Sequence, residues 1–410
     1  MRRRFGADVF LAILLPVACG LALLLLHPDR DEPRGKTPVE TALTSASVVC
    51  PDALPGTGSD LLGVSIIGAD PDTKVKGDVQ VGLGPSAAPL ALRTRRVSAA
   101  PPLGPTVITG SDDLAPGLVA GRSQSVPLAA VDCAPPVADQ WFTAVGAGAT
   151  HDSVVELVNP NAGPAIADIT VRSPSGILEV PALHGVSVPG NDSVRLDLGQ
   201  VTPHRNDRSL EVHTSRGRLS VHVVDTYDDL GAGASGQDWL PAQAEPATDN
   251  LLLGLATGKG ERTLVLANPG ADEVRATVKV VTPTSVFAPS GVDEVRVAPD
   301  TTEAVSLDDV LAQATRAGAT GLLVEASGPV TATMRQVVGG DLSLLSTAPE
   351  LDGSSAVVLP AGPKHLLLAG ADAVGAATVT SYSADGKQLD QQRVELGPES
   401  GADLALPDDA

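Results

Sequence analysis

Short runs of alternating apolar and polar residues dominate the chain beyond its first forty positions. Between residues 154 and 224 at least six such runs occur, separated by clusters of Gly, Pro, Asn or Asp. A period of two places the apolar side chains on one face of a strand, and turns at this spacing are typical of β-sandwiches. The pattern predicts a mostly β protein built from small sandwiches.

The same pattern returns at a fixed offset of 109 residues. Residues 155–162 (VELVNPNA) align with residues 264–271 (LVLANPGA), and the register continues without a gap for dozens of residues. A repeat of this length corresponds to one small domain rather than to a solenoid turn. We therefore expect tandem Ig-like or jelly-roll-type β-sandwich repeats. Each copy has a repeat turn after its first strand, at Asn159 and Pro160 and at Asn268 and Pro269.

These patterns divide the chain into six segments. The last segment is a half-repeat that lacks its final strands, so it must dock on the third sandwich or borrow a strand, such as residues 42–49. The expected boundaries are 1–26 for an anchor, 27–40 for a tether, 41–140, 141–240 and 241–350 for the sandwich units and 351–410 for the half-repeat.

The third unit carries an extra apolar segment at residues 306–318, where the second unit has a polar loop. Leu307 and Leu311 fall on one face of a helix, and Ser306 and Asp309 fit a capping box. The segment predicts a short helix over one end of that sandwich.

The N-terminus combines a positive charge with a long apolar run. Three arginines precede residues 9–26, which carry no charge and end without a small-x-small cleavage site. A cleaved signal peptide has an apolar region of about 7–15 residues, whereas about 17–25 apolar residues span a bilayer. Flanking arginines favour a cytoplasmic N-terminus. The sequence therefore predicts a signal anchor, a transmembrane helix over residues 1–26, and single-pass localisation in the cell membrane with the C-terminal ectodomain outside.

Two cysteines lie beyond the expected anchor. Cys50 and Cys133 flank the first sandwich unit. Disulfides persist outside the cytoplasm, and two cysteines permit only one intramolecular pairing. We expect a Cys50–Cys133 disulfide, with two buried thiols as the alternative.

Charge and aromatic content narrow the choice of partners. The net charge of −21 argues against binding to nucleic acid. Aromatic residues make up 2% of the chain, so the ring platform of a sugar-binding sandwich is not indicated. Trp141 and Trp239 lie in the linkers before the second and third units. We interpret them as interdomain packing residues, with stacking on a ligand as the alternative.

The densest polar cluster predicted from the sequence consists of His213, His222 and Asp225. If residues 210–213 and 218–224 pair as a hairpin, the two imidazoles approach each other and Asp225 orients one of them, which would suit a metal or an acid–base pair. The third unit has no histidine at the aligned positions. No catalytic motif occurs elsewhere. We therefore expect no enzyme activity, no cofactor and no bound metal.

In these motifs the chain resembles a domain-of-unknown-function family of actinobacterial membrane-anchored exported proteins. The resemblance rests on the Cys-x7-Trp segment from Cys133 to Trp141, on the turns at Asn159 and Asn268 and on the N-terminal anchor. It extends over most of residues 40–406 and departs where Gly370 begins the third turn. Members are often encoded near cell-envelope glycosyltransferases, which implies a role in the envelope by association.

The expected function is that of a non-enzymatic single-pass cell-envelope protein with an extracytoplasmic scaffold or interaction ectodomain. Its expected partners are the cytoplasmic membrane and envelope proteins or glycans. One alternative is a glycan-binding accessory protein of envelope polysaccharide assembly. Another is an exported hydrolase with its site around His213, His222 and Asp225.

Overall fold

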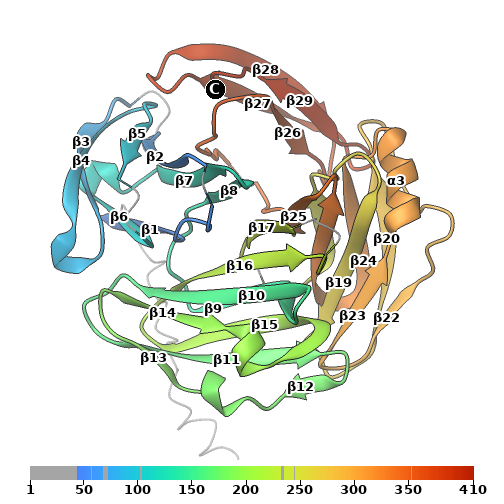
Figure 1. The fold of residues 1–410 in the computed structure, drawn as a ribbon. Helices are drawn as coiled ribbons and strands as arrows, with labels where there is room; N and C mark the ends of the chain where they lie inside the picture. Colours follow the sequence, from blue (N-terminus) through green and yellow to red (C-terminus); the bar gives the residue numbers. More distant parts are fainter. Residues whose placement is uncertain are drawn as a thin grey trace, which may run out of the picture. The chain divides into compact units, whose positions relative to one another are not determined.

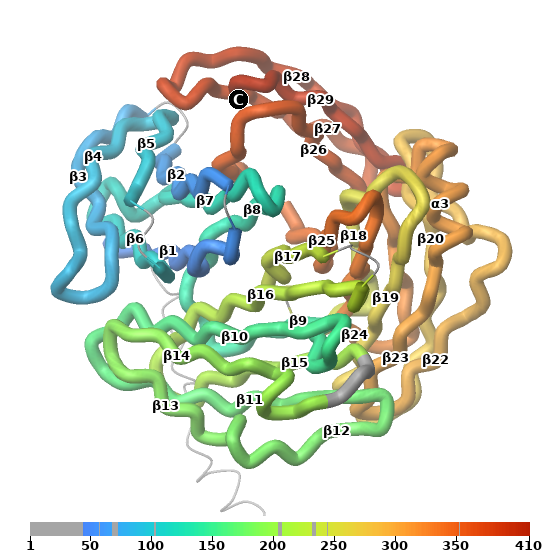
Figure 2. The backbone as a smooth tube through the Cα atoms, in the orientation of Figure 1, coloured from blue at the N-terminus to red at the C-terminus, as the bar shows by residue number. Residues whose placement is uncertain are grey.

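The computed structural model describes residues 44–56, 58–67, 73–101, 104–231, 235–243, 245–351 and 353–410, without the side chains of residues 204–206. β-Strands dominate these residues, and Leu43–Ala410 form one compact unit. Figure 1 labels the strands, and Figure 2 follows the backbone through them. The prediction of a mostly β protein with sandwich-like sheets is confirmed.

The first sandwich, sandwich A, has two four-stranded antiparallel sheets. Their strand orders are β1-β6-β3-β4 and β5-β2-β7-β8. Leu62 and Val64 of one sheet and Val79 and Ile108 of the other share one buried core. The elements are β1 (Ser45–Cys50), β2 (Asp60–Ile66), β3 (Lys76–Val81), η1 (Gly84–Ser86), β4 (Ala88–Arg93), β5 (Ser98–Ala100), β6 (Thr106–Ser111), η2 (Asp112–Leu114), β7 (Leu118–Ser125) and β8 (Leu128–Asp132).

Sandwich B follows the same plan. One group of strands runs β13-β11-β15-β9, and the other runs β14-β10-β16-β17. Strand β11 alternates buried and half-buried residues, as the period-two pattern predicts. The elements are β9 (Asp139–Ala147), β10 (His151–Asn159), β11 (Ala165–Ser173), β12 (Gly176–Leu178), η3 (Pro181–Leu183), β13 (Val186–Val188), β14 (Asp192–Asp197), α2 (Leu198–Val201), β15 (His204–Arg216), β16 (Ser220–Asp228) and β17 (Ser235–Leu240).

In sandwich C one long strand, β24, serves both sheets. Its first part pairs with β20 and β18, and its last part pairs with β19 and β25. The elements are β18 (Ala247–Leu253), β19 (Gly260–Asn268), β20 (Val274–Val281), β21 (Val286–Phe287), β22 (Val295–Val297), β23 (Thr301–Ser306), α3 (Asp308–Arg316), β24 (Gly321–Val338) and β25 (Asp341–Ser346).

The strand order is shared by the three sandwiches. In sandwich A, β2 lies between β5 and β7. In sandwich B, β10 lies between β14 and β16, and in sandwich C, β19 lies between β23 and the last part of β24. Asn159 and Asn268 are both fully buried. The Nδ2 atom of each asparagine donates to three backbone carbonyls at 2.8–3.2 Å. For Asn159 these are the carbonyls of Gly163, Val188 and Pro189, and for Asn268 they are those of Asp272, Val297 and Ala298. Each carbonyl of the second set lies 109 positions after its counterpart in the first.

The C-terminal residues form an incomplete sandwich, half-sandwich D. Among the described residues its strands make only two pairs, β26 with β29 and β27 with β28. The strand suggested as its complement, β1, pairs with β6 of sandwich A instead. The elements of D are β26 (Lys364–Leu368), β27 (Gly375–Tyr382), β28 (Gln388–Leu396) and β29 (Ala402–Leu406).

The predicted fold class included an N-terminal transmembrane helix before the β-sandwiches, and this part of the prediction was wrong. No helix within the described residues is long and apolar enough to cross a membrane. The anchor predicted over residues 1–26 lies outside the described residues. We therefore withdraw the transmembrane helix, and with it the single-pass localisation in the cell membrane.

Two local predictions are also corrected. Residues 210–213 and 218–224 do not form a hairpin, because β15 pairs with β9 and β11, whereas β16 pairs with β10 and β17. Helix α3 lies in the expected segment, but Leu307 precedes its first residue and no side chain caps it. The Asp308 carboxylate instead accepts the backbone N–H of Arg262, at 2.6 Å.

Candidate functional site

Polar side chains replace apolar ones at one end of the core of sandwich B. On β10, His151 and Ser153 are in phase with the core residues Val155 and Leu157. On β16, Asp225 is in phase with core residue Val223 and pairs in register with Ser153. The period of two therefore points His151, Ser153 and Asp225 to the same end of the core.

These side chains meet two others in a buried cluster, which we call the B–C network: His151, Ser153, Asp207, Asp225 and Arg335. His151 Nδ1 lies 2.9 Å from Asp207 Oδ1, and Nε2 lies 2.8 Å from Asp225 Oδ2. The Ser153 hydroxyl donates to the Asp225 carboxylate. Arg335 donates to Asp207 Oδ1 at 2.8 Å and also lies against His151 Nδ1. Asp225 is completely buried.

The surroundings of His151 favour its charged form. Burial and the charge of Arg335 would lower the pKa of His151, but the charge of Asp225 and the hydrogen bonds with Asp207 and Asp225 outweigh them and raise it to about 9. Burial would likewise raise the pKa of Asp207. The hydrogen bond from His151 and the charge of Arg335 instead bring it below its usual range. At neutral pH two cationic side chains thus face two carboxylates.

A third carboxyl group, Asp238, borders this network. It pairs in register with Asp225 on the neighbouring strand β17. Burial raises the pKa of Asp238 to about 8, and the charges of Asp341 and Asp225 act in the same direction. Asp238 is therefore protonated at neutral pH and adds no negative charge beside Asp225.

The B–C network lies where sandwich B meets sandwich C. Arg335 comes from β24, whereas the other four residues come from sandwich B. Nearby, the hydroxyls of Thr143 and Thr331 are 2.6 Å apart, and Thr302 donates to the backbone carbonyl of Asp207 at 3.3 Å. The ion pairs therefore join the two sandwiches.

The arrangement differs from that of a hydrolase. In the Ser-His-Asp arrangement of a hydrolase, the nucleophilic serine gives its proton to a histidine nitrogen, and an aspartate orients that histidine. Here the Ser153 hydroxyl donates to Asp225, and both nitrogens of His151 already face carboxylates. His151 is 8% exposed, so an incoming substrate would have little access to it. The geometry supports an electrostatic connection rather than proton transfer to a substrate.

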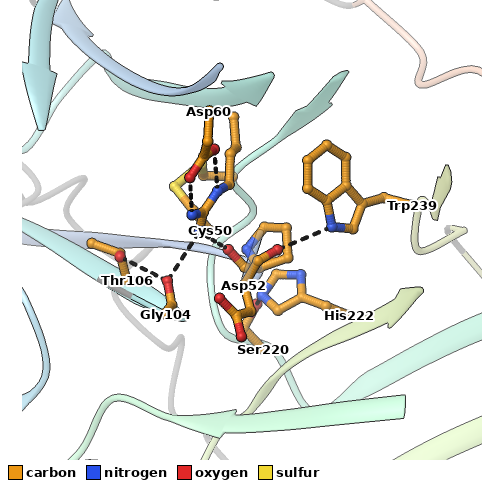
Figure 3. Close-up of a disulfide and its surroundings, with 11 residues drawn as sticks. Cys50, Asp52, Asp60, Gly104, Thr106, Ser220, His222 and Trp239 are labelled. Carbon is orange, nitrogen blue, oxygen red and sulfur yellow. Dashed lines mark hydrogen bonds and ion pairs between the residues drawn. A yellow bond between two sulfur atoms is a disulfide. The ribbon is translucent and has the colours of Figure 1, made fainter. Parts of the chain in front are cut away.

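A second junction joins sandwiches A and B beside the disulfide (Figure 3). The predicted bond between Cys50 and Cys133 is confirmed. Trp239 packs with Leu54 and Ala129 of sandwich A, and its Nε1 donates to the backbone carbonyl of Asp52 at 3.2 Å. This tryptophan therefore fills the seam between the two sandwiches.

Buried titratable groups also line the A–B junction. Glu156 is 3% exposed; its carboxylate accepts the backbone N–H of Asp52 at 3.2 Å and lies 3.5 Å from Arg195 Nε. Burial raises the pKa of Glu156. His222, which pairs in register with Glu156, lies 3.2 Å from the hydroxyl of Ser220, and burial lowers the pKa of His222 to about 3. His222 is therefore neutral at physiological pH.

The structure separates the three residues of the predicted polar cluster. His213 is exposed and lies 2.6 Å from Asp139 on the surface of sandwich B. His222 belongs to the A–B junction, and Asp225 belongs to the B–C network. They do not converge, because β15 and β16 pair with different strands. The described residues hold no group of three or more His, Cys, Asp and Glu side chains that could bind a metal.

Trp141, the other predicted packing residue, is 7% exposed. The guanidinium of Arg172 lies over its ring at 5.2 Å from the centroid. The same arginine lies 3.5 Å from Asp300 of sandwich C. Trp141 thus lies under an arginine that extends toward the neighbouring sandwich.

The residues of the B–C network that were not predicted from the sequence are His151, Ser153, Asp207 and Arg335. Two of the network's positions carried a signal, since His151 and Ser153 interrupt an alternating apolar pattern while keeping its phase. No pattern in the sequence marks Arg335 as their partner, because 184 positions separate it from His151.

Comparison with known protein families identifies the family of this chain. Residues 93–407 match the model of a family of unknown function, DUF5719. The chain belongs to DUF5719. This confirms the prediction that the chain belongs to a family of unknown function. Neither a search of curated proteins nor a search of solved structures gives a match.

The DUF5719 match begins at the last residue of β4 and ends one residue after β29. It therefore contains all five residues of the B–C network, together with His222 and Trp239. Cys50 and Asp52 of the A–B junction lie before it. Membership of DUF5719 assigns no activity to any of these residues.

Proposed function

We propose that this protein is a non-enzymatic scaffold that holds partner proteins together during actinobacterial cell-envelope assembly. One observation carries the proposal: two groups of buried polar side chains join one sandwich to the next. Arg335 of sandwich C is paired with Asp207 of sandwich B at 2.8 Å, and Trp239 of sandwich B is bonded to sandwich A. Such groups fix the order and orientation of neighbouring units, which is what a scaffold requires.

The disulfide supports a role in an oxidising compartment. Cys50 and Cys133 are joined across 83 positions. Structural disulfides persist in such compartments and are rare in the cytosol. The aliphatic, ring-poor composition supports protein partners over glycans, since sugar-binding surfaces commonly stack aromatic rings on their ligand.

Affinity capture tests this proposal. The full chain, tagged and isolated from its own cells after crosslinking, should retain specific proteins. An Arg335→Ala variant should lose partners that bridge sandwiches B and C, whereas Arg275→Ala, which alters an exposed arginine of sandwich C, should retain them. Recovery of glycan without protein would favour the accessory glycan-binding alternative and contradict the scaffold.

A further inference from the structure

Half-sandwich D lacks the strands that complete sandwiches A, B and C. In sandwich C the last part of β24 pairs with β19, and its first part pairs with β20. The equivalents of β19 and β20 in half-sandwich D are β26 and β27. Residues 366–369 (LLLA) match residues 264–267 (LVLA), and β29 and β28 pair with β26 and β27 as β23 and β22 pair with β19 and β20. Among the described residues, each of these pairs on one side only. One edge of β26 and one edge of β27 therefore present unpaired backbone N–H and C=O groups.

Side chains that would form a core are left partly uncovered. Leu366 and Leu368 of β26 occupy the places of Leu264 and Leu266 in β19, which are both fully buried. In half-sandwich D the two leucines are only half-buried. Val379 of β27 is half-buried as well. None of these residues belongs to the five core clusters found among the described residues.

Sandwich C shows what kind of strand covers such a surface. Ala332 and Met334 of β24 alternate along the strand beside β19, and Leu322 and Val324 alternate along the strand beside β20. All four are fully buried in the core of sandwich C. The missing element is thus an extended segment with aliphatic residues at every second position.

The neighbouring parts of the chain touch half-sandwich D at its turns and at Tyr382, the last residue of β27, over whose ring the guanidinium of Arg95 lies. The N–H of Gly401 donates to the carbonyl of Thr282 in sandwich C, at 2.9 Å. The N–H of Val97 in sandwich A donates to the carbonyl of Ala384, at 2.9 Å. Val358, in the segment that leads into D, lies against Gly63 and Gly121 of sandwich A rather than over β26. Within the part of the chain that the structure describes, none of these contacts lies along the edge of β26 opposite β29.

Charge decides between possible occupants. Residues 355–410 contain three Lys and Arg residues against eight Asp and Glu residues, a net charge of −5. The whole chain carries −21, so a second copy would meet like charge. A segment rich in Lys or Arg would meet opposite charge. Electrostatic complementarity therefore favours a cationic partner.

We propose that half-sandwich D is an acceptor for an extended cationic segment of a partner protein, which adds as a β-strand to the open edge of β26. Main-chain hydrogen bonds supply the attachment, and the aliphatic side chains cover Leu366 and Leu368. This proposal rests on the scaffold function and names the surface by which the scaffold takes up a partner.

Peptide binding to the full chain tests the proposal. The probe is a nine-residue peptide in which Val alternates with Lys and Thr. Its control has the same composition, with the Val residues placed together. The alternating peptide should bind at least about tenfold more tightly than the control, because only alternation presents one apolar face. It should also slow amide exchange in β26.

Two matched variants locate the site. Leu366→Asp places a charge on the face that the aliphatic side chains of the added strand would cover and should weaken peptide binding at least about tenfold. Leu367→Asp changes the other face of the same strand and should leave binding within about threefold. Amide exchange on the unaltered chain provides a readout that does not depend on whether Leu366→Asp folds.

Three results would overturn the proposal: equal binding of both peptides, protection of strands other than β26, or a concentration-dependent dimer that protects β26 without peptide. The last result would identify a second copy as the occupant. If the peptides fail while the full chain still captures proteins from cells, the strand acceptor is wrong and the scaffold function stands.

Discussion

At the scale of single residues, His151 and His222 lie in the same sandwich and have pKa values shifted in opposite directions. His222 has a folded-state pKa of about 3, so from about pH 6.5 down to 3 the unfolded chain binds a proton that the folded chain excludes. Stability falls as the pH falls through this range. His151 has a folded-state pKa of about 9. The contribution of the charged His151 to the free energy of unfolding is complete below about pH 6.5 and is lost as the pH rises toward 9.

Replacing His222 should remove one cause of acid sensitivity. In the His222→Gln variant, the loss of stability between pH 7 and pH 4.5 should be about 2 kcal/mol smaller than in the unaltered protein, because no buried imidazole has to be protonated. Urea denaturation at the two pH values measures this. The exposed His365→Gln serves as the control and should behave like the unaltered protein. An unchanged acid dependence in His222→Gln would show that His222 is not a buried neutral imidazole.

Replacing His151 should be costly at neutral pH. His151→Gln leaves Asp225 buried without its cationic partner, and removal of one member of a buried pair costs about 3–5 kcal/mol. The exposed pair of His213 with Asp139 should contribute less than about 1 kcal/mol, so His213→Gln is the matched control. Urea midpoints at pH 7 compare the two variants. Equal midpoints would contradict the B–C network.

At the scale of elements, Asn159 and Asn268 end the equivalent strands β10 and β19 of sandwiches B and C. Each side chain satisfies three backbone carbonyls and accepts one backbone N–H. No aliphatic residue can make these bonds, and unsatisfied buried carbonyls are costly. The Asn-Pro turn is therefore a structural requirement of each copy, which explains why it is the clearest repeat signal in the sequence.

Removing either asparagine should destabilise its own sandwich by a similar amount. We expect Asn159→Ala and Asn268→Ala each to cost about 2–4 kcal/mol, because several buried bonds are lost at once. Asn161→Ala, in the same turn but largely exposed, should cost less than about 1 kcal/mol. Thermal unfolding of the three variants provides the comparison. A large difference between the two repeat positions would argue against their equivalence.

The sequence allowed the local parts of this structure to be predicted, because alternation, turn residues and the offset of 109 are local signals. The strands of sandwich B and the Asn159 turn follow directly from them. The pairing of β15 and β16 did not follow, since consecutive strands of a sandwich can pair either with each other or with different partners. The B–C network was missed for a related reason: Asp207, His151 and Arg335 are brought together by tertiary packing alone.

At the scale of the whole molecule, the disulfide closes the longest covalent loop of sandwich A. Cys50 is the last residue of the edge strand β1, and Cys133 directly follows β8, at a separation of 83 positions. Replacing both cysteines with serine should lower the stability of sandwich A by up to about 4–5 kcal/mol in the chain-entropy model. Scanning calorimetry should then show one transition at a lower temperature, with the transitions of sandwiches B and C unchanged. A uniform shift of every transition would instead indicate that the sandwiches unfold as one.

The central claim is that one sandwich plan occurs three times and is left incomplete a fourth time. Hydrogen exchange of the full chain tests it most directly, by comparing β19 with its equivalent β26. We predict slow exchange along β19, which has a paired strand on both sides, and much faster exchange along β26, which is paired only with β29. Equal protection of the two strands in the isolated monomer would show that half-sandwich D is already complete and would contradict the claim.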